Sequence, residues 1–309
     1  MIAGRIAITG ASGFLGGRLV AALAGEPAEV VALSRRPDAA RAALGPTHPR
    51  LTVAGYDPLD PASIAPALAG ATSVVHLAGA PIAARWTPET RRAIRESREL
   101  GTRALVKAIA ASSPRPATLI SASACRYYGV SETARFTETS PAGHGGDHLT
   151  DTCVAWEREA MAATELGLRV VILRFGIALA LTPEGRRLLD GLRRFLGGRI
   201  GSGRQWVSWI HREDAVAIMM RALENEAMSG AYNAVAPFPA KMSRVTEAFG
   251  RVAGGFVRVP VPGMVIRQVL GDGATVVLDG QRVHPDRLER EGFVWRFPEI
   301  DRAVQDILS

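Results

Sequence analysis

Residues 6–16 read Ile6-Ala7-Ile8-Thr9-Gly10-Ala11-Ser12-Gly13-Phe14-Leu15-Gly16, an apolar run that enters three glycines spaced three residues apart. Glycine permits a tight turn at the first position, close approach of the backbone to a pyrophosphate at the second, and close helix packing at the third. Leu15, Leu19 and Leu23 recur at helical spacing, so the segment predicts a strand, a turn and a helix. We expect the positive end of that helix to face the phosphates of a dinucleotide. The contacts are expected from Gly10, Ser12, Gly13, Phe14, Leu15 and Gly16.

The composition is that of a globular protein with a core of its own. The chain has 309 residues, of which 47% are hydrophobic, so disulfides are not needed for stability. Its two cysteines, Cys125 and Cys153, show no metal-ligand spacing, so we expect no metal site and a reducing compartment. We see neither a signal peptide nor a membrane-spanning apolar run. A cytoplasmic protein without a membrane partner is therefore expected.

The net charge of +7 raises the possibility of a nucleic-acid partner. Nearly all the basic residues are arginine, with lysine only at Lys107 and Lys241, and many alternate with acids, as in Arg91–Glu99. Interleaved charge does not form a continuous basic surface, so we expect no nucleic-acid partner and keep such binding as an alternative. The densest basic stretch, Arg186–Arg204, is either a solvated helix face or a cover over an anionic substrate or cofactor.

Strands and helices alternate along the first part of the chain. Strands are predicted at Glu29–Leu33, Leu51–Ala54, Ser73–Gly79, Ala117–Ser121 and Leu168–Leu173, and helices at 88–112 and 153–165. This order predicts an α/β fold, a doubly wound parallel sheet of the Rossmann type that binds ligands at its carboxyl edge. Later segments are more mixed, with strands expected at Tyr232–Val235 and Phe256–Val259 and helices at 213–224 and 301–308. We expect a dinucleotide-binding domain at 1–220 and a small C-terminal domain at 245–307, which contributes to a smaller mixed α/β substrate lobe.

The end of the second predicted strand bears on the choice of cofactor. Ser34-Arg35-Arg36 stands where an acidic residue would accept hydrogen bonds from the ribose of NAD. A hydroxyl followed by two guanidinium groups suits a 2′-phosphate instead, so we expect NADP in preference to NAD. The strand that begins at Ser73 ends in small residues, up to Gly79, which let the backbone come near the same cofactor.

A nicotinamide enzyme that acts on an alcohol or carbonyl must also move one proton. A tyrosine with a lysine four residues later on a helix is a common solution, and no Tyr-x-x-x-Lys occurs in this sequence. The catalytic candidates are Ser123, Tyr127 and Tyr128, just beyond the predicted fifth strand. Ser123 could hydrogen-bond a substrate oxygen or only cap the strand end. The tyrosines could donate a proton or only form walls of a cleft.

The histidines favour structural roles. His211 stands three residues before Asp214, and we expect a buried pair that anchors the second lobe rather than a catalytic or zinc site. His76, inside a predicted strand, is expected to be a hydrogen-bonded core residue. His144 and His148 lie in a glycine-rich segment that is either a mobile lid or a surface excursion.

Several motifs together give the chain a wider resemblance. They are Thr-Gly-x-x-Gly-Phe-x-Gly at 9–16, His-Leu-Ala-Gly at 76–79, Gly101-Thr102, Tyr-Tyr-Gly at 127–129 and Trp209-Ile210-His211-x-x-Asp214. The set resembles the extended short-chain dehydrogenase/reductases, and within them the atypical epimerase-family proteins that end in a small C-terminal domain of unknown function. Further marks of that branch are Arg85-Trp86-Thr87, Trp156-Glu157 and Leu278-Asp279-Gly280-Gln281-Arg282-Val283.

The resemblance implies an NADP-binding Rossmann fold over nearly the whole chain. It implies that Arg98 reaches the cofactor from the long helix, and that Ser123 occupies the family's usual Ser/Thr position. It further implies cofactor contacts at Ser34, Arg35, Leu77, Ala78, Gly176, Ile177 and Ala178. The absent Tyr-Lys pair is typical of this branch.

Two functions follow as hypotheses. The first is an NADP(H)-dependent oxidoreductase or epimerase that acts on a small polar or nucleotide-linked substrate, as a monomer or homodimer. The second is a catalytically silent NADP(H)-binding regulator or redox sensor.

Overall fold

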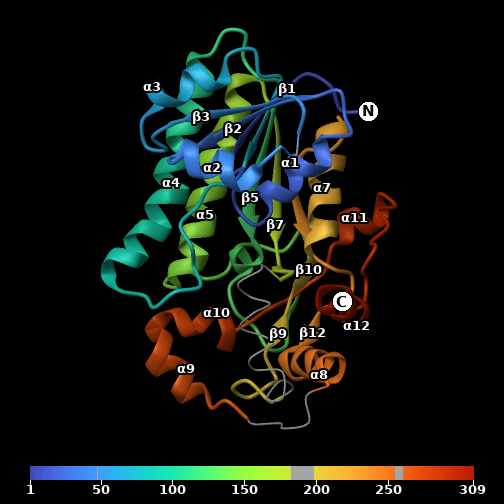
Figure 1. The fold of residues 1–309 in the computed structure, drawn as a ribbon. Coiled ribbons are helices and arrows are strands. Elements are labelled where there is room, and N and C mark those ends of the chain that lie inside the picture. Colours follow the sequence, from blue (N-terminus) through green and yellow to red (C-terminus); the bar gives the residue numbers. More distant parts are fainter. Residues whose placement is uncertain (47, 182–197, 255–259) are drawn as a thin grey trace.

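A seven-stranded parallel sheet forms the centre of the molecule, as the computed structural model shows (Figure 1). The structure describes residues 1–46, 48–181, 198–254 and 260–309. The strand order is β11-β7-β5-β4-β1-β2-β3, so the chain reverses its direction of travel across the sheet between β1 and β4. In parallel sheets such a reversal opens a crevice at the carboxyl edge, where ligands bind. The strands are β1 (Arg5–Thr9), β2 (Glu29–Ser34), β3 (Leu51–Gly55), β4 (Ser73–His76), β5 (Thr118–Ala124), β7 (Arg169–Phe175) and β11 (Gly230–Ala234).

Helices cover both faces of the sheet, because the strands are apolar on both sides. On one face Ile6 and Ile8 pack with residues of α1 and α7, and on the other Ala7 packs with residues of α4. The helices of this part are α1 (Gly16–Leu23), α2 (Pro37–Leu44), α3 (Pro61–Ile64), α4 (Pro88–Ala111), α5 (His148–Met161) and α7 (Arg212–Glu224). This confirms the prediction of a doubly wound α/β fold.

The remaining segments form a smaller lobe beyond the carboxyl edge of the sheet (Figure 1). It contains short two-stranded ladders, with β8 (Ile177–Leu179) on β10 (Trp209–His211), β9 (Trp206–Val207) on β12 (Ala240–Lys241), and β13 (Arg282–Val283) on β6 (Arg135–Phe136). Its helices are α8 (Met242–Ala253), α9 (Gly263–Leu270), α10 (Thr275–Leu278) and α12 (Ile300–Leu308). Helix α11 (Asp286–Arg290) packs instead on β11, and its Leu288 belongs to the core of the main sheet. Trp209, Met242 and Phe297 belong to the hydrophobic core of the lobe.

The lobe also contacts the loop that follows β4. The backbone N–H of Trp86 donates to the carbonyl of Leu270 at 3.2 Å, and Arg91 pairs with Asp272 at 3.1 Å. A Cβ on Gly273 would come within 2.8 Å of the Trp86 ring, so the two segments are tightly packed. The C-terminal part therefore covers the loop between β4 and α4.

Some boundaries differ from the predictions. The fifth strand continues to Ala124 instead of ending at Ser121, because it stays paired with β7 along its whole length. The fourth ends at His76, and residues 77–79 form a loop. The strand predicted at 256–259 and most of the basic stretch 186–204 lie outside the described residues.

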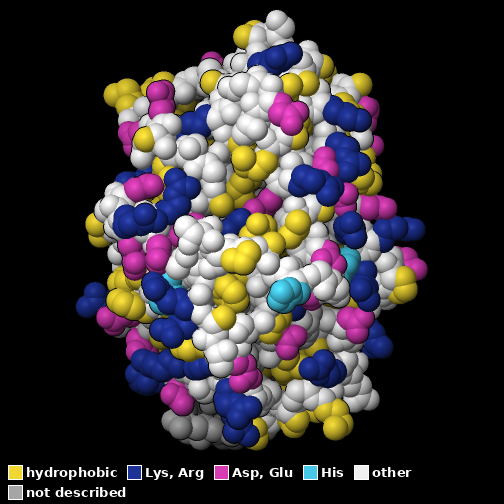
Figure 2. Space-filling model, turned by 180° about the vertical axis from the view of Figure 1, so that it is seen from behind, with side chains coloured by type: hydrophobic (Ala, Val, Ile, Leu, Met, Phe, Trp, Pro, Cys, Tyr) yellow, Lys and Arg dark blue, Asp and Glu magenta, His cyan; other side chains and the backbone are white. Residues whose placement is uncertain are grey.

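The surface in Figure 2 shows Lys and Arg side chains interspersed with Asp and Glu rather than gathered into one basic field. In the described ranges, none of the helices combines the length and apolarity needed to cross a bilayer.

Candidate active site

The glycine turn between β1 and α1 has the geometry expected of an anion cradle. Gly10 adopts a φ of +70°, which disfavours any residue with a side chain. A Cβ on Gly16 would lie 2.3 Å from the Gly10 carbonyl oxygen. Within the described part of the chain, the backbone N–H groups of Phe14 and Leu15, just before α1, make no hydrogen bond. Free N–H groups at a helix N-terminus fit a phosphate.

The end of β4 lies directly against this turn. A Cβ on Gly10 would come within 2.9 Å of the Ala78 backbone nitrogen, so the backbones of the two loops are in contact. The Ala78 N–H donates to the Thr9 hydroxyl at 3.3 Å. The predicted cofactor residues that follow β1 and β4 are therefore together at the point where the strand order reverses.

Arg98 reaches this edge from α4. Its Nη1 donates to the carbonyls of Ala80 and Ile94 at 3.1 Å, and its guanidinium carbon lies 5.1 Å from the centre of the Trp156 ring. A Cβ on Gly79 would stand 3.1 Å from the same guanidinium. Within the described residues, Arg98 pairs with no carboxylate, so its charge is uncompensated at the crevice.

The end of β2 carries exposed positive charge. Ser34 Oγ accepts from the Arg36 N–H at 3.1 Å, which shapes the turn, and both arginine side chains are exposed. Arg35 lies close enough to Tyr56 to lower that phenol's pKa, although burial, the larger effect, raises the pKa to about 12. No acidic residue occupies positions 34–36. The segment thus fits a 2′-phosphate, as the sequence predicts.

His76 is a core residue. Its Nδ1 lies 2.7 Å from the Thr9 hydroxyl, and its Nε2 lies 2.9 Å from the Thr102 hydroxyl. Burial, and to a lesser extent the charge of Arg98, lowers the pKa of His76 to about 4. The neutral imidazole joins β1, β4 and α4 below the crevice.

A row of polar residues crosses three adjacent strands at the carboxyl edge. Ser123 of β5 is paired in register with Arg174 of β7, which is paired in register with Asn233 of β11. All three side chains are buried. Registered residues of parallel strands project to the same side, here towards α5.

Glu157 of α5 completes this row. The Ser123 hydroxyl donates to Glu157 Oε1 at 2.6 Å. Arg174 donates to the same carboxylate through Nε and Nη2, both at 2.8 Å. This two-pronged guanidinium contact fixes the orientation of the Glu157 carboxylate. Burial lowers the pKa of Arg174, but the hydrogen bonds and the charge of Glu157 outweigh it and raise that pKa above its already high usual value. A serine hydroxyl is therefore held on a buried, oriented carboxylate.

The two tyrosines occupy different positions around Arg174. The Tyr128 hydroxyl accepts from Arg174 Nη1 at 2.8 Å and donates to Asn233 Oδ1 at 2.7 Å. Burial raises the pKa of Tyr128 well above its usual range. Tyr127 lies under the guanidinium, with 3.6 Å from the guanidinium carbon to the ring centre. Its hydroxyl makes no hydrogen bond to the described residues.

The segment after β7 is packed against β10. A Cβ on Gly176 would lie 2.5 Å from the Ser208 carbonyl oxygen, and the Ile177 N–H donates to that oxygen at 2.8 Å. Ile177 is 44% exposed, and Ala178 is half-buried. The segment begins where β7 ends, two residues from Arg174.

His211 and Asp214 do not form the predicted pair with each other. His211 Nε2 lies 3.3 Å from a carboxylate oxygen of Asp306 instead. Asp214 accepts from the backbone N–H groups of Arg296 and Phe297 at 2.7 and 3.0 Å. The His211 ring lies against Phe297, with 4.0 Å between ring centres. These contacts attach α7 to the C-terminal segment and leave both residues outside the polar row.

Sequence reasoning missed Glu157, Arg174 and Asn233 as site residues. One signal was present, because Cys153 and Glu157 repeat the four-residue spacing of Tyr-x-x-x-Lys on the corresponding helix. Burial raises the pKa of the Cys153 thiol to about 12, with Glu157 adding to it and Arg98 opposing it. The thiol is therefore protonated, and Glu157 is the ionisable residue of the pair that contacts Ser123.

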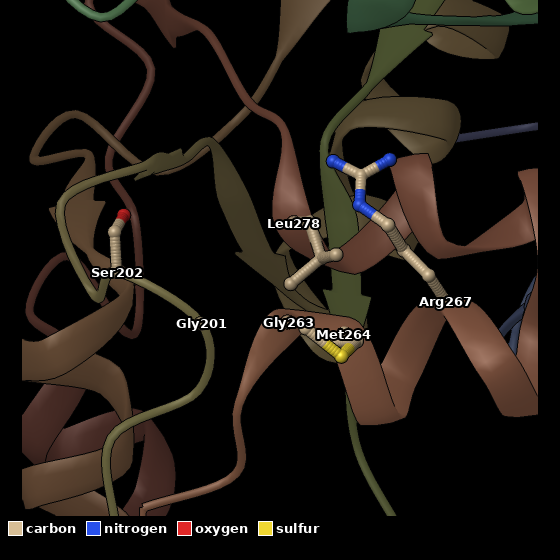
Figure 3. A pocket seen from close by; sticks show the side chains of 6 residues that line it. All are labelled: Gly201, Ser202, Gly263, Met264, Arg267 and Leu278. Carbon is tan, nitrogen blue, oxygen red and sulfur yellow. The ribbon is translucent and has the colours of Figure 1, made fainter.

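A separate cavity of about 490 Å³ lies in the lobe, not at the sheet edge (Figure 3). In the close-up, the side chains of Met264 on α9 and Leu278 on α10 lie near one another, and the loop at Gly201 runs beside them. Its lining is formed by Gly201, Ser202, Gly263, Met264, Arg267 and Leu278.

The parallel sheet, the glycine turn at its reversal point and Ser123 near the end of β5 define a Rossmann protein of the short-chain dehydrogenase/reductase type. The chain belongs to the NAD dependent epimerase/dehydratase family, whose model matches residues 6–234. A domain of unknown function, DUF1731, matches residues 261–307.

Relatives match over most of the chain. It is 35% identical over 309 residues to the Arabidopsis thaliana "Epimerase family protein SDR39U1 homolog, chloroplastic", which covers 98% of this chain and 86% of that protein. It is 34% identical over 235 residues to epimerase family protein YfhF of Bacillus subtilis, covering 76% of this chain and 77% of that protein. The human epimerase family protein SDR39U1 (isoform 2), solved with NADPH, superposes with a TM-score of 0.83 and 31% identity, over 98% of this chain and 99% of that one.

Proposed function

We propose that this protein is an NADP(H)-dependent oxidoreductase of the short-chain type, acting on a small polar or nucleotide-linked substrate. The observation that carries the proposal is the 2.6 Å hydrogen bond from Ser123 to Glu157, at the edge where the glycine turn also lies. When bound, a nicotinamide cofactor supplies or accepts the hydride. The protein must then supply a path for one proton, and Ser123 with Glu157 forms such a path.

The direction of the Ser123 hydrogen bond determines the order of the proton transfers. Because its own proton points at Glu157, Ser123 Oγ has lone pairs free to accept a substrate hydroxyl. As the substrate carbon loses its hydride, the hydroxyl proton moves to Ser123 Oγ and the serine proton moves to Glu157. In the reverse reaction protonated Glu157 returns the proton through Ser123 to a carbonyl oxygen. Successive oxidation and reduction at one carbon would give epimerisation.

Arg174 is a positioning residue in this scheme. Its contacts to both carboxylate oxygens hold Glu157 in place beside the serine hydroxyl. The same guanidinium contacts Tyr127 and Tyr128. We infer that Tyr128 orients this network, since both of its hydrogen-bonding directions are occupied, and that Tyr127 lines the substrate space.

In this proposal the protein binds NADP in preference to NAD. Support comes from Ser34, Arg35 and Arg36 at the end of β2, without an acidic residue to hold a ribose hydroxyl. The human relative solved with NADPH supports the same cofactor. A further structure, the nucleoside-diphosphate sugar epimerase of Corynebacterium glutamicum, is 32% identical with a TM-score of 0.76, covering 99% of this chain and 58% of that one. It supports a nucleotide-linked substrate.

The test follows NADPH consumption with a panel of carbonyl, quinone and nucleotide-sugar compounds. Ser123→Ala and Glu157→Gln should each lower kcat about 100-fold while NADPH affinity changes less than about twofold. Glu159→Gln is the matched control, because Glu159 lies on the same helix but pairs with Arg103. NADPH binding without turnover of any compound would overturn the proposal and favour the silent regulator.

A further inference from the structure

A group of unpaired cations surrounds Trp206 in the lobe. Lys241 is the direct cross-strand partner of Trp206 in the β9–β12 ladder, and its ammonium nitrogen lies 3.9 Å from the ring centre. The guanidinium carbon of Arg282, on β13, lies 4.8 Å from the same ring centre. The indole N–H donates to the carbonyl of Glu132 at 2.9 Å, which fixes the ring. The ring is thus a rigid platform with two cations against it.

These cations lack carboxylate partners. Within the described residues, no Asp or Glu oxygen lies within 4.0 Å of the charged groups of Lys241, Arg282 or the exposed Arg204, whereas most arginines of α4 are paired. The Nε of Arg282 is buried and has no hydrogen-bond partner there. The pKa of Lys241 is lowered mainly by burial, with Arg282 and Arg204 adding and Glu132 opposing. Lys241 and Arg282 therefore share one ring without a carboxylate paired to either of them.

The group is separate from the polar row. Val283, the next residue of β13, is buried with Tyr128 and Cys125. Adjacent residues of a strand point to opposite faces, so Arg282 projects away from the Tyr128 side. The backbone on both sides of Arg282 is fixed by Ser208, whose hydroxyl donates to the Gln281 carbonyl at 2.7 Å and accepts from the Val283 N–H at 3.0 Å. The cations thus have a rigid base outside the crevice.

We propose that Lys241 and Arg282 form a second anion site on the Trp206 platform, which binds a phosphoryl group of a small molecule. Two neighbouring cations with no carboxylate within 4.0 Å among the described residues match a phosphoryl group, whose several oxygens can accept from both. The Nε of Arg282 makes no hydrogen bond to the described residues, so this guanidinium is not committed to a partner within that part of the chain. The site stands independently of the oxidoreductase proposal.

The test uses calorimetric titration of the full chain with inorganic pyrophosphate at about 0.15 M ionic strength. We expect saturable binding that Lys241→Gln weakens about tenfold and Arg282→Gln at least as much. Lys107→Gln is the matched control, because Lys107 is the other lysine of the sequence and is exposed on α4. Lys241 is partly exposed, so its variant should unfold at the same temperature as the parent chain.

A second arm separates this site from the cofactor site. Arg35→Gln, which addresses the proposed 2′-phosphate site, and saturation with NADPH, which would fill the glycine turn, should each leave pyrophosphate binding intact. ADP in place of pyrophosphate distinguishes the source of the phosphoryl group, since tighter binding of ADP with the same dependence on Lys241 indicates a nucleotide. The proposal is overturned if pyrophosphate does not saturate, if Lys107→Gln weakens binding equally, or if Arg35→Gln or saturation with NADPH abolishes it.

Discussion

Acidification should weaken the fold through His76, and the size of the effect can be worked out. The unfolded chain protonates this imidazole near its ordinary pKa of 6.5, whereas the folded chain resists protonation down to about 4. Because the unfolded state binds the proton first, the stability that His76 contributes is fully present above the unfolded pKa and falls as the pH drops towards the folded pKa. The whole pKa shift of His76 corresponds to about 3 kcal/mol in the free energy of unfolding. About 2 kcal/mol of this stability is lost between pH 7 and pH 5.

The comparison variant is His76→Gln, which has similar length and does not titrate. Urea unfolding at about pH 7 and pH 5 gives the free energy of unfolding of each protein. The parent chain should lose about 2 kcal/mol more than the variant over this interval. Subtracting the variant removes the contributions of other histidines, such as His48 and His211, whose pKa values burial also lowers. Equal losses, or a His76 imidazole whose NMR signals titrate near pH 6.5, would refute the reasoning.

Three further changes test the site. Gly16→Ala places a Cβ 2.3 Å from the Gly10 oxygen and should cost about 2 kcal/mol or more in thermal unfolding and abolish dinucleotide binding, whereas Gly17→Ala, with 3.7 Å to its nearest neighbour, should not. If Gly16→Ala unfolds at the same temperature as the parent chain and still binds the dinucleotide, the close packing of Gly16 on Gly10 is refuted. Arg35→Ala should weaken NADPH binding about tenfold, measured by tryptophan quenching, and leave NADH binding unchanged. An equal loss for both nucleotides would argue against a 2′-phosphate contact. Tyr128→Phe leaves Arg174 Nη1 and Asn233 Oδ1 unpaired, so it should cost about 1–3 kcal/mol of stability by urea unfolding. In the NADPH assay it should lower kcat less than Ser123→Ala does, and a larger loss would assign Tyr128 the proton transfer.

The sheet and the glycine turn could be predicted because their signals are local. Alternating apolar segments indicated each described strand of the sheet, and residues 10–16 carry the turn within seven positions. Ser123 was identified as a candidate from its place near the end of a strand. The structure adds that it lies within β5, paired with Arg174.

The polar row could not be predicted in the same way. Ser123, Arg174 and Asn233 are neighbours only because three strands pair in one register, and no spacing within the sequence encodes that register. Arg174 follows a run of apolar residues, so the sequence alone indicates only that a strand ends there. The spacing of Glu157 from Cys153 is a local signal in the sequence. Only the hydrogen bond to Ser123 in the structure shows that Glu157 belongs to the candidate site.

The position of β11 has a consequence for how the molecule is made. Asn233 closes the polar row from β11, and its side chain donates to the carbonyl of His284 at 2.8 Å. A nascent chain that has emerged only as far as β7 therefore exposes an unpaired strand edge and holds Arg174 without its outer neighbour. Synthesis of the last third of the chain supplies β11, which pairs with β7, and Asn233, which accepts a hydrogen bond from Tyr128. β11 then forms the edge of the sheet, where Glu138 accepts from the Asn233 N–H at 3.0 Å and Arg287 donates to the Ala231 carbonyl at 2.9 Å. The protein can complete its polar row only after this strand has been made.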